Sequence, residues 1–306
     1  MDKKKRRGDR KDGWRVRDTD TMHLFTPYIL TNRADCEAFM TEVIDLTAVN
    51  AFLEKKNAEN PEFKYTVFHV ITAAVAKVFV QRPYMNRFYA GRRYYERKDI
   101  TFSFVVKKKF CDNSEESLAI IKVDRDSEIS PLEQIHGKIR DIVYSVRKKN
   151  QTDGTTDKMG DLMKLPRCIL RFVMSILRWL DYHGWYPSVL MNDDPYFSSV
   201  FISNLGSIKM HANYHHLTNW GTNSVFLIIG EKKPTAFFHA DGTYDVRDAL
   251  ELSLTVDERI ADGLYFANSI KLLRTLLANP ELLELPIQTP VEFSEASARE
   301  AVKIMK

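Results

Sequence analysis

The stretch LSLTVDERIADGLYFANSIKLL, residues 252–273, decides the fold. It is typical of a strand that runs into a tight turn at Asp262-Gly263 and then into a helix. Enzymes often carry a catalytic base at such a junction. Glu258 stands at the position where that base is expected, so the question is whether the stretch forms a working active site.

The positive charge of the chain lies almost entirely in residues 1–20. The chain has 306 residues, a formal net charge of +4 and 44% hydrophobic residues, which is enough for one large core or two modest ones. The first twenty residues hold nine Lys and Arg against five Asp, and the remainder holds 36 of each sign. We expect a flexible solvated tail over 1–20, with a nucleic-acid or anionic-lipid anchor as the alternative.

Cysteine usage and the N-terminal sequence indicate a cytoplasmic protein. Cys36, Cys111 and Cys168 are widely spaced and odd in number, which argues against a disulfide framework or a zinc site, so no metal is expected. The basic start has no apolar segment and is not a signal peptide. The electroneutral remainder gives no reason to expect nucleic acid as a partner.

Strand and helix patterns alternate along the chain. A strand followed by a helix is expected over 42–57, a buried helix over 65–83 and an amphipathic helix over 131–149. Gly91 marks a turn between strands, and Asp241-Gly242 marks a hairpin turn into the strand that precedes Glu258. No nucleotide-binding glycine loop and no internal repeat is present. One α/β domain over 21–290 with a C-terminal tail over 291–306 is the simplest interpretation.

An apolar segment with a basic edge interrupts the alternation at 163–195. Its run CILRFVMSILRWL is too short to span a bilayer. Arg167, Arg171 and Arg178 fall among large apolar residues, which predicts a helix with a wide apolar face. A core or subunit-interface helix is the default interpretation. A membrane-surface helix through 165–180 and a lid over a long acyl chain are the alternatives.

Four blocks of sequence resemble the chloramphenicol acetyltransferase-like family, and most closely the catalytic domain of the dihydrolipoyl acyltransferases of 2-oxo-acid dehydrogenase complexes. They are VIDLTAVNAFL (43–53), RPYMNRFY (82–89) after the buried helix, FISNLGSI (201–208) and LSLTVDERIADG (252–263). The blocks occur in the family's order and cover roughly residues 25–285.

The resemblance implies a mixed β-sheet flanked by helices, assembled as a homotrimer with active sites between subunits. In the family, a His from an HxxxDG motif removes the proton of the acyl acceptor. A Ser or Thr from the strand before an SxLG turn, on the neighbouring subunit, hydrogen-bonds to the oxyanion. The motif's Asp pairs with an Arg that holds the turn.

Carried over to this chain, Ser203 matches the oxyanion hydroxyl, and Asp262 with Gly263 matches the DG pair. Glu258 stands in place of the His. Arg259 beside the base, and Asn204 and Gly206 of the SxLG turn, complete the expected structural support. A second departure is Lys107, where the family's nearest members carry an acidic residue. The resemblance implies no covalently bound cofactor, and no lipoyl domain is expected in this chain.

Three interpretations of Glu258 compete. Glu258 is the base, if burial raises its pKa from the usual value of about 4.3 toward that of a thiol, about 8.5. Alternatively His215 or His216, which follow the SxLG turn, serves as the base. In the third interpretation the chain is a non-catalytic trimeric pseudoenzyme that binds acyl-coenzyme A or a protein partner. The expectation adopted is an acyltransferase that moves an acyl group from a small-molecule thioester, acyl-coenzyme A, to a thiol, hydroxyl or amine.

Three other features have both a functional and a packing interpretation. The basic residues around Gly91 either hold the phosphates of coenzyme A or protect a strand edge. Arg33 is a candidate partner of Asp262. Trp220 lines a cleft or packs beside a glycine turn. The basic residues are Arg92, Arg93, Arg97, Lys98 and Lys107 to Lys109.

Overall fold

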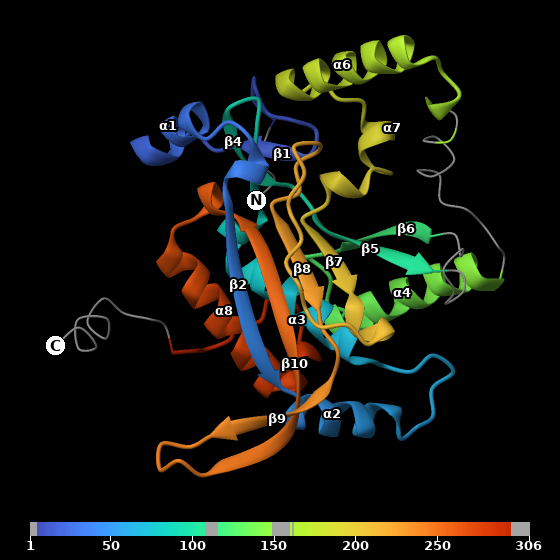
Figure 1. Cartoon of the computed structure of the whole chain (residues 1–306), viewed down its shortest axis with the longest axis vertical. Helices are drawn as coiled ribbons and strands as arrows, with labels where there is room; N and C mark the ends of the chain where they lie inside the picture. Colours follow the sequence, from blue (N-terminus) through green and yellow to red (C-terminus); the bar gives the residue numbers. More distant parts are fainter. Residues whose placement is uncertain (1–4, 108–115, 149–159, 161, 295–306) are drawn as a thin grey trace.

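The computed structural model describes residues 5–107, 116–148, 160 and 162–294. Within this part the chain is a mixed α/β fold with one large sheet and one small sheet (Figure 1). Lys108, Lys109 and Cys111 of the sequence predictions lie outside the described residues.

The large sheet has the strand order β2-β10-β8-β7-β5-β6, with β9 paired to the free part of β10. β7 runs parallel to β5 and β8, and the other pairs are antiparallel. The mixed sheet expected from the sequence is therefore confirmed. The strands are β2 (Glu37–Asp45), β5 (Ile100–Lys107), β6 (Glu116–Val123), β7 (Val200–Asn204), β8 (Val225–Ile229), β9 (Lys233–Phe238) and β10 (Tyr244–Asp257).

Four helices form one layer against the large sheet. In α3, eleven consecutive residues from His69 to Phe79 are buried, because this helix lies between the sheet and its neighbours α4 and α8. The helix ends before Pro83, which has no N–H to continue it. The helices are α2 (Thr47–Asn57), α3 (Val67–Gln81), α4 (Pro131–Lys148) and α8 (Gly263–Ala278), all close to the ranges predicted from periodicity.

The basic N-terminal stretch is not a free tail where the structure describes it. β1 (Gly13–Arg15) pairs with β4 (Arg93–Arg97), which in turn pairs with β3 (Arg87–Ala90) to form the small sheet. Arg10 is 1% exposed and donates to both carboxylate oxygens of Asp12. The expectation of a flexible tail over 1–20 is wrong for this part, because arginine side chains there have buried carboxylate and carbonyl partners.

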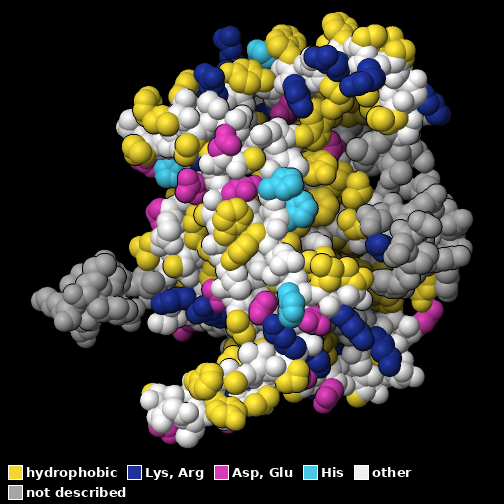
Figure 2. All heavy atoms as spheres, in the orientation of Figure 1, with side chains coloured by type: hydrophobic (Ala, Val, Ile, Leu, Met, Phe, Trp, Pro, Cys, Tyr) yellow, Lys and Arg dark blue, Asp and Glu magenta, His cyan; other side chains and the backbone are white. Residues whose placement is uncertain are grey.

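The segment 163–195 forms α6 (Arg167–His183) and the short helix α7 (Ser188–Met191). α6 lies along the outer edge of the molecule, and hydrophobic and basic side chains gather over it (Figures 1 and 2). No residue of α6 is buried, and Phe172 and Trp179 are 67% and 53% exposed. The core interpretation of this helix is therefore wrong for the chain as described. α1 (Thr21–Ile29) lies beside the small sheet, separate from α6.

None of the helices in the described part of the chain is both long and apolar enough to cross a membrane.

Candidate functional site

Glu258 is the first residue after β10 and begins a short 3-10 turn, Glu258–Ile260. Its backbone N–H donates to the carbonyl of Cys36 at 2.8 Å, which fixes the end of β10 against the segment before β2. The Glu258 side chain is exposed. The described residues therefore do not bury this carboxylate.

The turn is held by a buried ion pair next to Glu258. Asp257 is 0% exposed, and both its oxygens accept from Arg259, at 2.8 and 2.7 Å. Arg33 lies on the other side of Asp257, with its Nε 3.7 Å from the carboxylate. A bidentate pair of this kind combines charge attraction with a fixed geometry. The pair sets the direction in which Glu258 leaves the strand.

Arg33 also ties three separate segments together. Its guanidinium donates to the carbonyls of Thr218, Gly221 and Tyr89 at 2.8 to 3.0 Å. Burial lowers the pKa of Arg33, while the attraction of Asp257 opposes that shift. The expected pairing of Arg33 with Asp262 is wrong, because Asp257 is the carboxylate that lies beside it.

Asp262 and Gly263 form the start of α8. The Asp262 side chain accepts the N–H of Tyr265 at 2.8 Å and so caps the helix. Gly263 is the first helical residue, and a Cβ added there would meet no atom within 4 Å. The side chain of Asp262 therefore holds the helix start, and the described chain gives no steric reason for Gly263.

Ser203 lies near the end of β7 and lines a cavity of about 490 Å³. Asn204 shares this lining, whereas Gly206 packs against the carbonyl of Gly230, where a Cβ would come within 2.5 Å. Apolar side chains dominate the walls. They are Phe63, Phe68, Phe104, Val105, Val106, Ile139, Val143, Ile202, Leu205 and Ile208.

His69 lines the same cavity and was not anticipated from the sequence. Its Nδ1 accepts the backbone N–H of Thr66, so the neutral ring carries its proton on Nε2. Nε2 is buried and has no hydrogen-bond partner among the described residues. Burial lowers the pKa of His69 to about 3, and His136 nearby adds to the shift. The residue is therefore a neutral donor. The Thr66-x-x-His69 spacing, which resembles a capping box, is the signal that could have revealed it.

Ser203 and Glu258 lie far apart within one chain. Ser203 pairs with Ile228 of β8, and Ile228 pairs with Ser253 of β10. Glu258 is five residues beyond Ser253, which corresponds to about 17 Å along the strand, and it is displaced by two strands, roughly 10 Å. The two side chains therefore cannot act on the same atom within one chain.

The paired histidines lie in an exposed loop. The ring of His215 stacks on Phe226 at 4.3 Å and on His216 at 4.9 Å. The next residue, Leu217, donates its N–H to Glu37 at the start of β2. This anchors the loop near the Glu258 end of the sheet, whereas Ser203 is level with Ser253, toward the middle of β10. In the described part of the chain, no hydrogen bond, ion pair or ring contact joins either histidine to Ser203 or Glu258.

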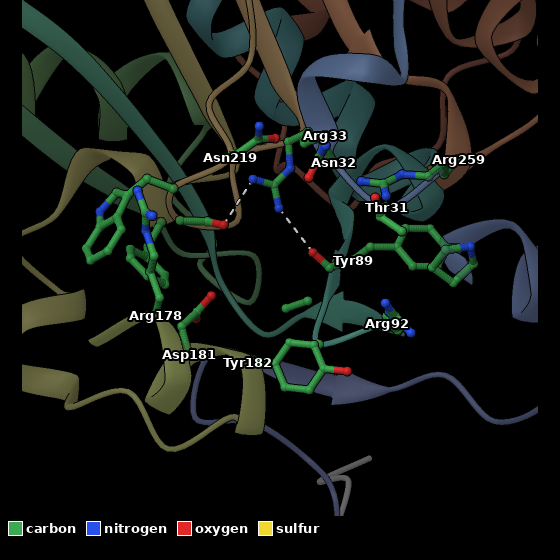
Figure 3. Close-up of a pocket in the computed structure, with 16 residues that line it drawn as sticks. Thr31, Asn32, Arg33, Tyr89, Arg92, Arg178, Asp181, Tyr182, Asn219 and Arg259 are labelled. Carbon is green, nitrogen blue, oxygen red and sulfur yellow. Dashed lines mark hydrogen bonds between the residues drawn. The ribbon is translucent and has the colours of Figure 1, made fainter. Parts of the chain in front are cut away.

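A second cavity, of about 440 Å³, is lined by Arg33, Arg259 and neighbouring residues of 27–32, the β3–β4 turn and α6 (Figure 3). Arg92 and Trp220, which the sequence offered for ligand binding, both line it. Arg97 does not, since it is buried and donates to the carbonyls of Phe197 and Thr222. Among the described residues, no group of three or more His, Cys, Asp or Glu side chains is placed to hold a metal ion.

Comparison with known proteins gives the fold and a family match over part of the chain. Residues 190–285 match the model of the 2-oxoacid dehydrogenases acyltransferase catalytic domain. No curated protein sequence matches the chain.

Solved structures match over most of the chain. The dihydrolipoamide acetyltransferase of Azotobacter vinelandii superposes with a TM-score of 0.56 at 19% identity, covering 88% of this chain and 94% of that one. A probable dihydrolipoamide acetyltransferase of Listeria monocytogenes gives 0.54 at 16%, covering 86% and 94%. A chloramphenicol acetyltransferase gives 0.55 at 11%, covering 87% and 99%. The chain thus has the chloramphenicol acetyltransferase-like fold, and its residues 190–285 match the acyltransferase catalytic domain of 2-oxoacid dehydrogenases.

Proposed function

We propose that this protein is an acyltransferase whose active site forms between two copies of the chain, with Glu258 from one and Ser203 from the other. The observation that carries the proposal is the separation of these two residues within one chain. The Asp257–Arg259 pair holds the turn that carries Glu258. Ser203 is held in strand β7 and lines a cavity. A neighbouring subunit is needed to bring them together.

The projecting hairpin supports a multimer, which we propose to be a homotrimer. β9 and the first part of β10 extend from the body as a two-stranded arm (Figure 1). This arm exposes three large apolar side chains, Phe238, Tyr244 and Val246, at 76%, 59% and 62%. Clustered exposed apolar residues on a soluble protein commonly mark an interaction surface.

In the proposed reaction, Glu258 accepts the proton of a thiol, hydroxyl or amine as this acceptor attacks the thioester carbonyl. The Ser203 hydroxyl donates a hydrogen bond to the oxyanion of the tetrahedral intermediate. Collapse of the intermediate transfers the acyl group and expels the thiolate, which takes up a proton. Burial of Glu258 by the neighbouring subunit would make it a stronger base.

The cavity beside Ser203 has mostly apolar walls, which supports an acyl thioester as the donor. We propose acyl-coenzyme A as this thioester. The cavity walls suit an acyl chain or a pantetheine arm, while the hydroxyl of Ser203 and the ring of His69 supply polar groups. Most of a small-molecule site is typically apolar, with a few placed polar groups.

The test is thiol release from short- and long-chain acyl-coenzyme A with thiol, amine and alcohol acceptors. Glu258→Gln should lower kcat by about 100- to 10,000-fold, the usual effect of losing a general base. Ser203→Ala should lower it by about 100- to 1,000-fold. Glu54→Gln, at an exposed position on α2, is the matched control and should keep full activity.

The second candidate function is a non-catalytic binder, which the exposed carboxylate at the usual histidine position favours. It predicts acyl-coenzyme A binding without turnover in the wild type, and unchanged affinity in Glu258→Gln. Turnover that appears only in Glu258→His would establish this function and contradict the proposal above.

A further inference from the structure

Helix α6 covers two neighbouring cavities that share one lining residue, Trp220. We call the first the arginine cavity, which is the 440 Å³ space of Figure 3. The second, the apolar cavity, measures about 370 Å³. The apolar cavity is lined by Leu118, Leu162, Met174, Leu177, Tyr186, Leu190, Asp193, Asp194, Pro195, Tyr196, Thr218 and Trp220.

The arginine cavity has an excess of positive charge. Four arginines and one carboxylate, Asp181, line it. The carboxylate is already engaged, because Asp181 accepts from Arg10 at 2.7 Å. Arg92 and Arg178 lie on opposite sides of the hollow (Figure 3), and neither has a carboxylate partner in the described part of the chain. The remaining two are Arg33 and Arg259.

Arg33 adds a buried positive charge to this wall. The residue is 94% buried, and its Nε lies 3.7 Å from the Asp257 carboxylate, so that nitrogen faces Asp257. Arg92 and Arg178, which have no carboxylate partner among the described residues, therefore supply the charge that favours an anion in the cavity.

The apolar cavity suits a hydrocarbon chain. Met174 and Leu177 come from the inner side of α6, and the ring of Tyr186 stacks on Phe197 at 4.8 Å. Asp194 also lines this cavity, and its side chain accepts from Trp220 Nε1 at 2.7 Å and from the Tyr196 N–H at 3.0 Å. Burial raises the pKa of Asp194. Asp193 and Asp194 disfavour an anion in the apolar cavity. An anionic head group is therefore expected in the arginine cavity.

We propose that α6 covers a binding site for an anionic amphiphile, with its head group in the arginine cavity and its alkyl tail beyond Trp220 in the apolar cavity. The head group is a carboxylate or a phosphate, since arginine binds both in the same way. None of the lining residues lines the Ser203 cavity. The site therefore differs from the Ser203 cavity, although Arg33 and Arg259 of its wall also hold the turn that carries Glu258. The binding test below does not require acyl transfer.

The test is isothermal titration calorimetry of the full chain with decanoate and decyl phosphate, below their micelle concentrations. Decanol, which lacks the charge, and butyrate, which lacks the tail, are the comparison ligands. Decanoate, decyl phosphate or both should bind at least about tenfold more tightly than decanol and butyrate. The stronger of the two identifies the head group.

Helix α6 provides its own matched controls. Arg178→Gln, facing the arginine cavity, should weaken binding of the anionic ligand at least about tenfold, and Leu177→Asn should do the same through the tail. Arg171→Gln and Phe172→Asn change exposed positions on the same helix that line neither cavity, and they should leave affinity unchanged. Circular dichroism confirms that each variant is folded.

Three results would overturn the proposal. The first is decanol binding as tightly as the anionic ligands. The second is an equal effect of Arg178→Gln and Arg171→Gln, which would indicate adsorption to the outer face of α6. The third is no binding of either anionic ligand.

Discussion

Asp257 and Asp262 lie five positions apart and stabilise different parts of the turn around Glu258. Asp257 is fully buried and shared by Arg259 and Arg33, whereas Asp262 is exposed and caps α8. Both residues are aspartates, but one is buried and the other is exposed. Their contributions to the free energy of unfolding should therefore differ.

Replacing these aspartates should separate the two contributions. Asp257→Ala leaves two arginines without their buried partner, and we expect it to lower the free energy of unfolding by about 3–5 kcal/mol. Asp262→Ala removes a helix cap and should cost about 1 kcal/mol. Urea denaturation of both variants measures the difference. Equal losses would contradict the assignment of the buried pair to Asp257.

His69 should make the protein sensitive to mild acid. Its pKa is lowered to about 3 in the folded chain because it is buried. The unfolded chain takes up a proton near pH 6.5, and the folded chain does so only near pH 3. Stability should therefore be intact above pH 6.5 and decline as the pH falls from there toward 3, by up to about 1.4 kcal/mol per pH unit.

His69→Gln tests this dependence because glutamine can keep the cap with Thr66 while losing the titration. Urea unfolding at pH 7 and pH 5 should show a smaller acid-induced loss in His69→Gln than in the wild type. His216→Gln, at an exposed position, is the control and should retain the full loss. An unchanged pH dependence in His69→Gln would refute the role of this residue.

The motif residues Glu258, Ser203 and Asp262 could be located from the sequence because their blocks occur in a fixed order. The partner of Arg33 could not, since two aspartates stand close together and only the folded turn shows which one is buried. His69 was missed because a histidine in an apolar helix is usually part of the core. That its Nε2 has no partner among the described residues becomes visible only when the cavity is known.

At the scale of the elements, α6 lies outside the core and is held by contacts with the N-terminal segment and the β3–β4 turn. Arg10 reaches both the side chain and the carbonyl of Asp181. Gly91 in the turn approaches the carbonyl of Tyr182 so closely that an added Cβ would come within 1.9 Å. These contacts fix α6 over its two cavities.

Gly91→Ala should displace α6. The position also has a φ of 56°, which an alanine adopts only with strain. Hydrogen exchange should become faster across residues 167–183 and stay unchanged in α8. Gly242→Ala is a matched control, because its φ is 86° but a Cβ there would meet nothing within 4 Å. Equal exchange of α6 in both variants would show that the Gly91 contact does not hold the helix.

Periodicity predicted the helices of the core well, because each has one apolar face and one neighbouring sheet. It predicted that α6 is a helix but not where the helix packs. A helix with such a wide apolar face can pack in a core, at a subunit interface or as a lid. β1 was missed because its charges suggested a solvated tail. Arg10 pairs with Asp12 and also with Asp181, which lies 171 residues away in the chain.

At the scale of the whole molecule, the two proposed catalytic residues lie at different levels of one sheet. Glu258 follows the end of β10, and Ser203 is level with the middle of the same strand. The projecting β9–β10 arm and its exposed apolar side chains are consistent with assembly of several copies. The sequence predicted the sheet from local patterns, but the separation within one chain follows only from the strand register.

The most direct test of the shared site is complementation between two inactive variants. Co-expressed Glu258→Gln and Ser203→Ala chains, mixed equally in a homotrimer, should form about one intact site in four and restore about a quarter of wild-type acyl-transfer activity. Each variant alone should be nearly inactive. Mixed trimers with no more activity than either variant alone would contradict an active site built from two subunits.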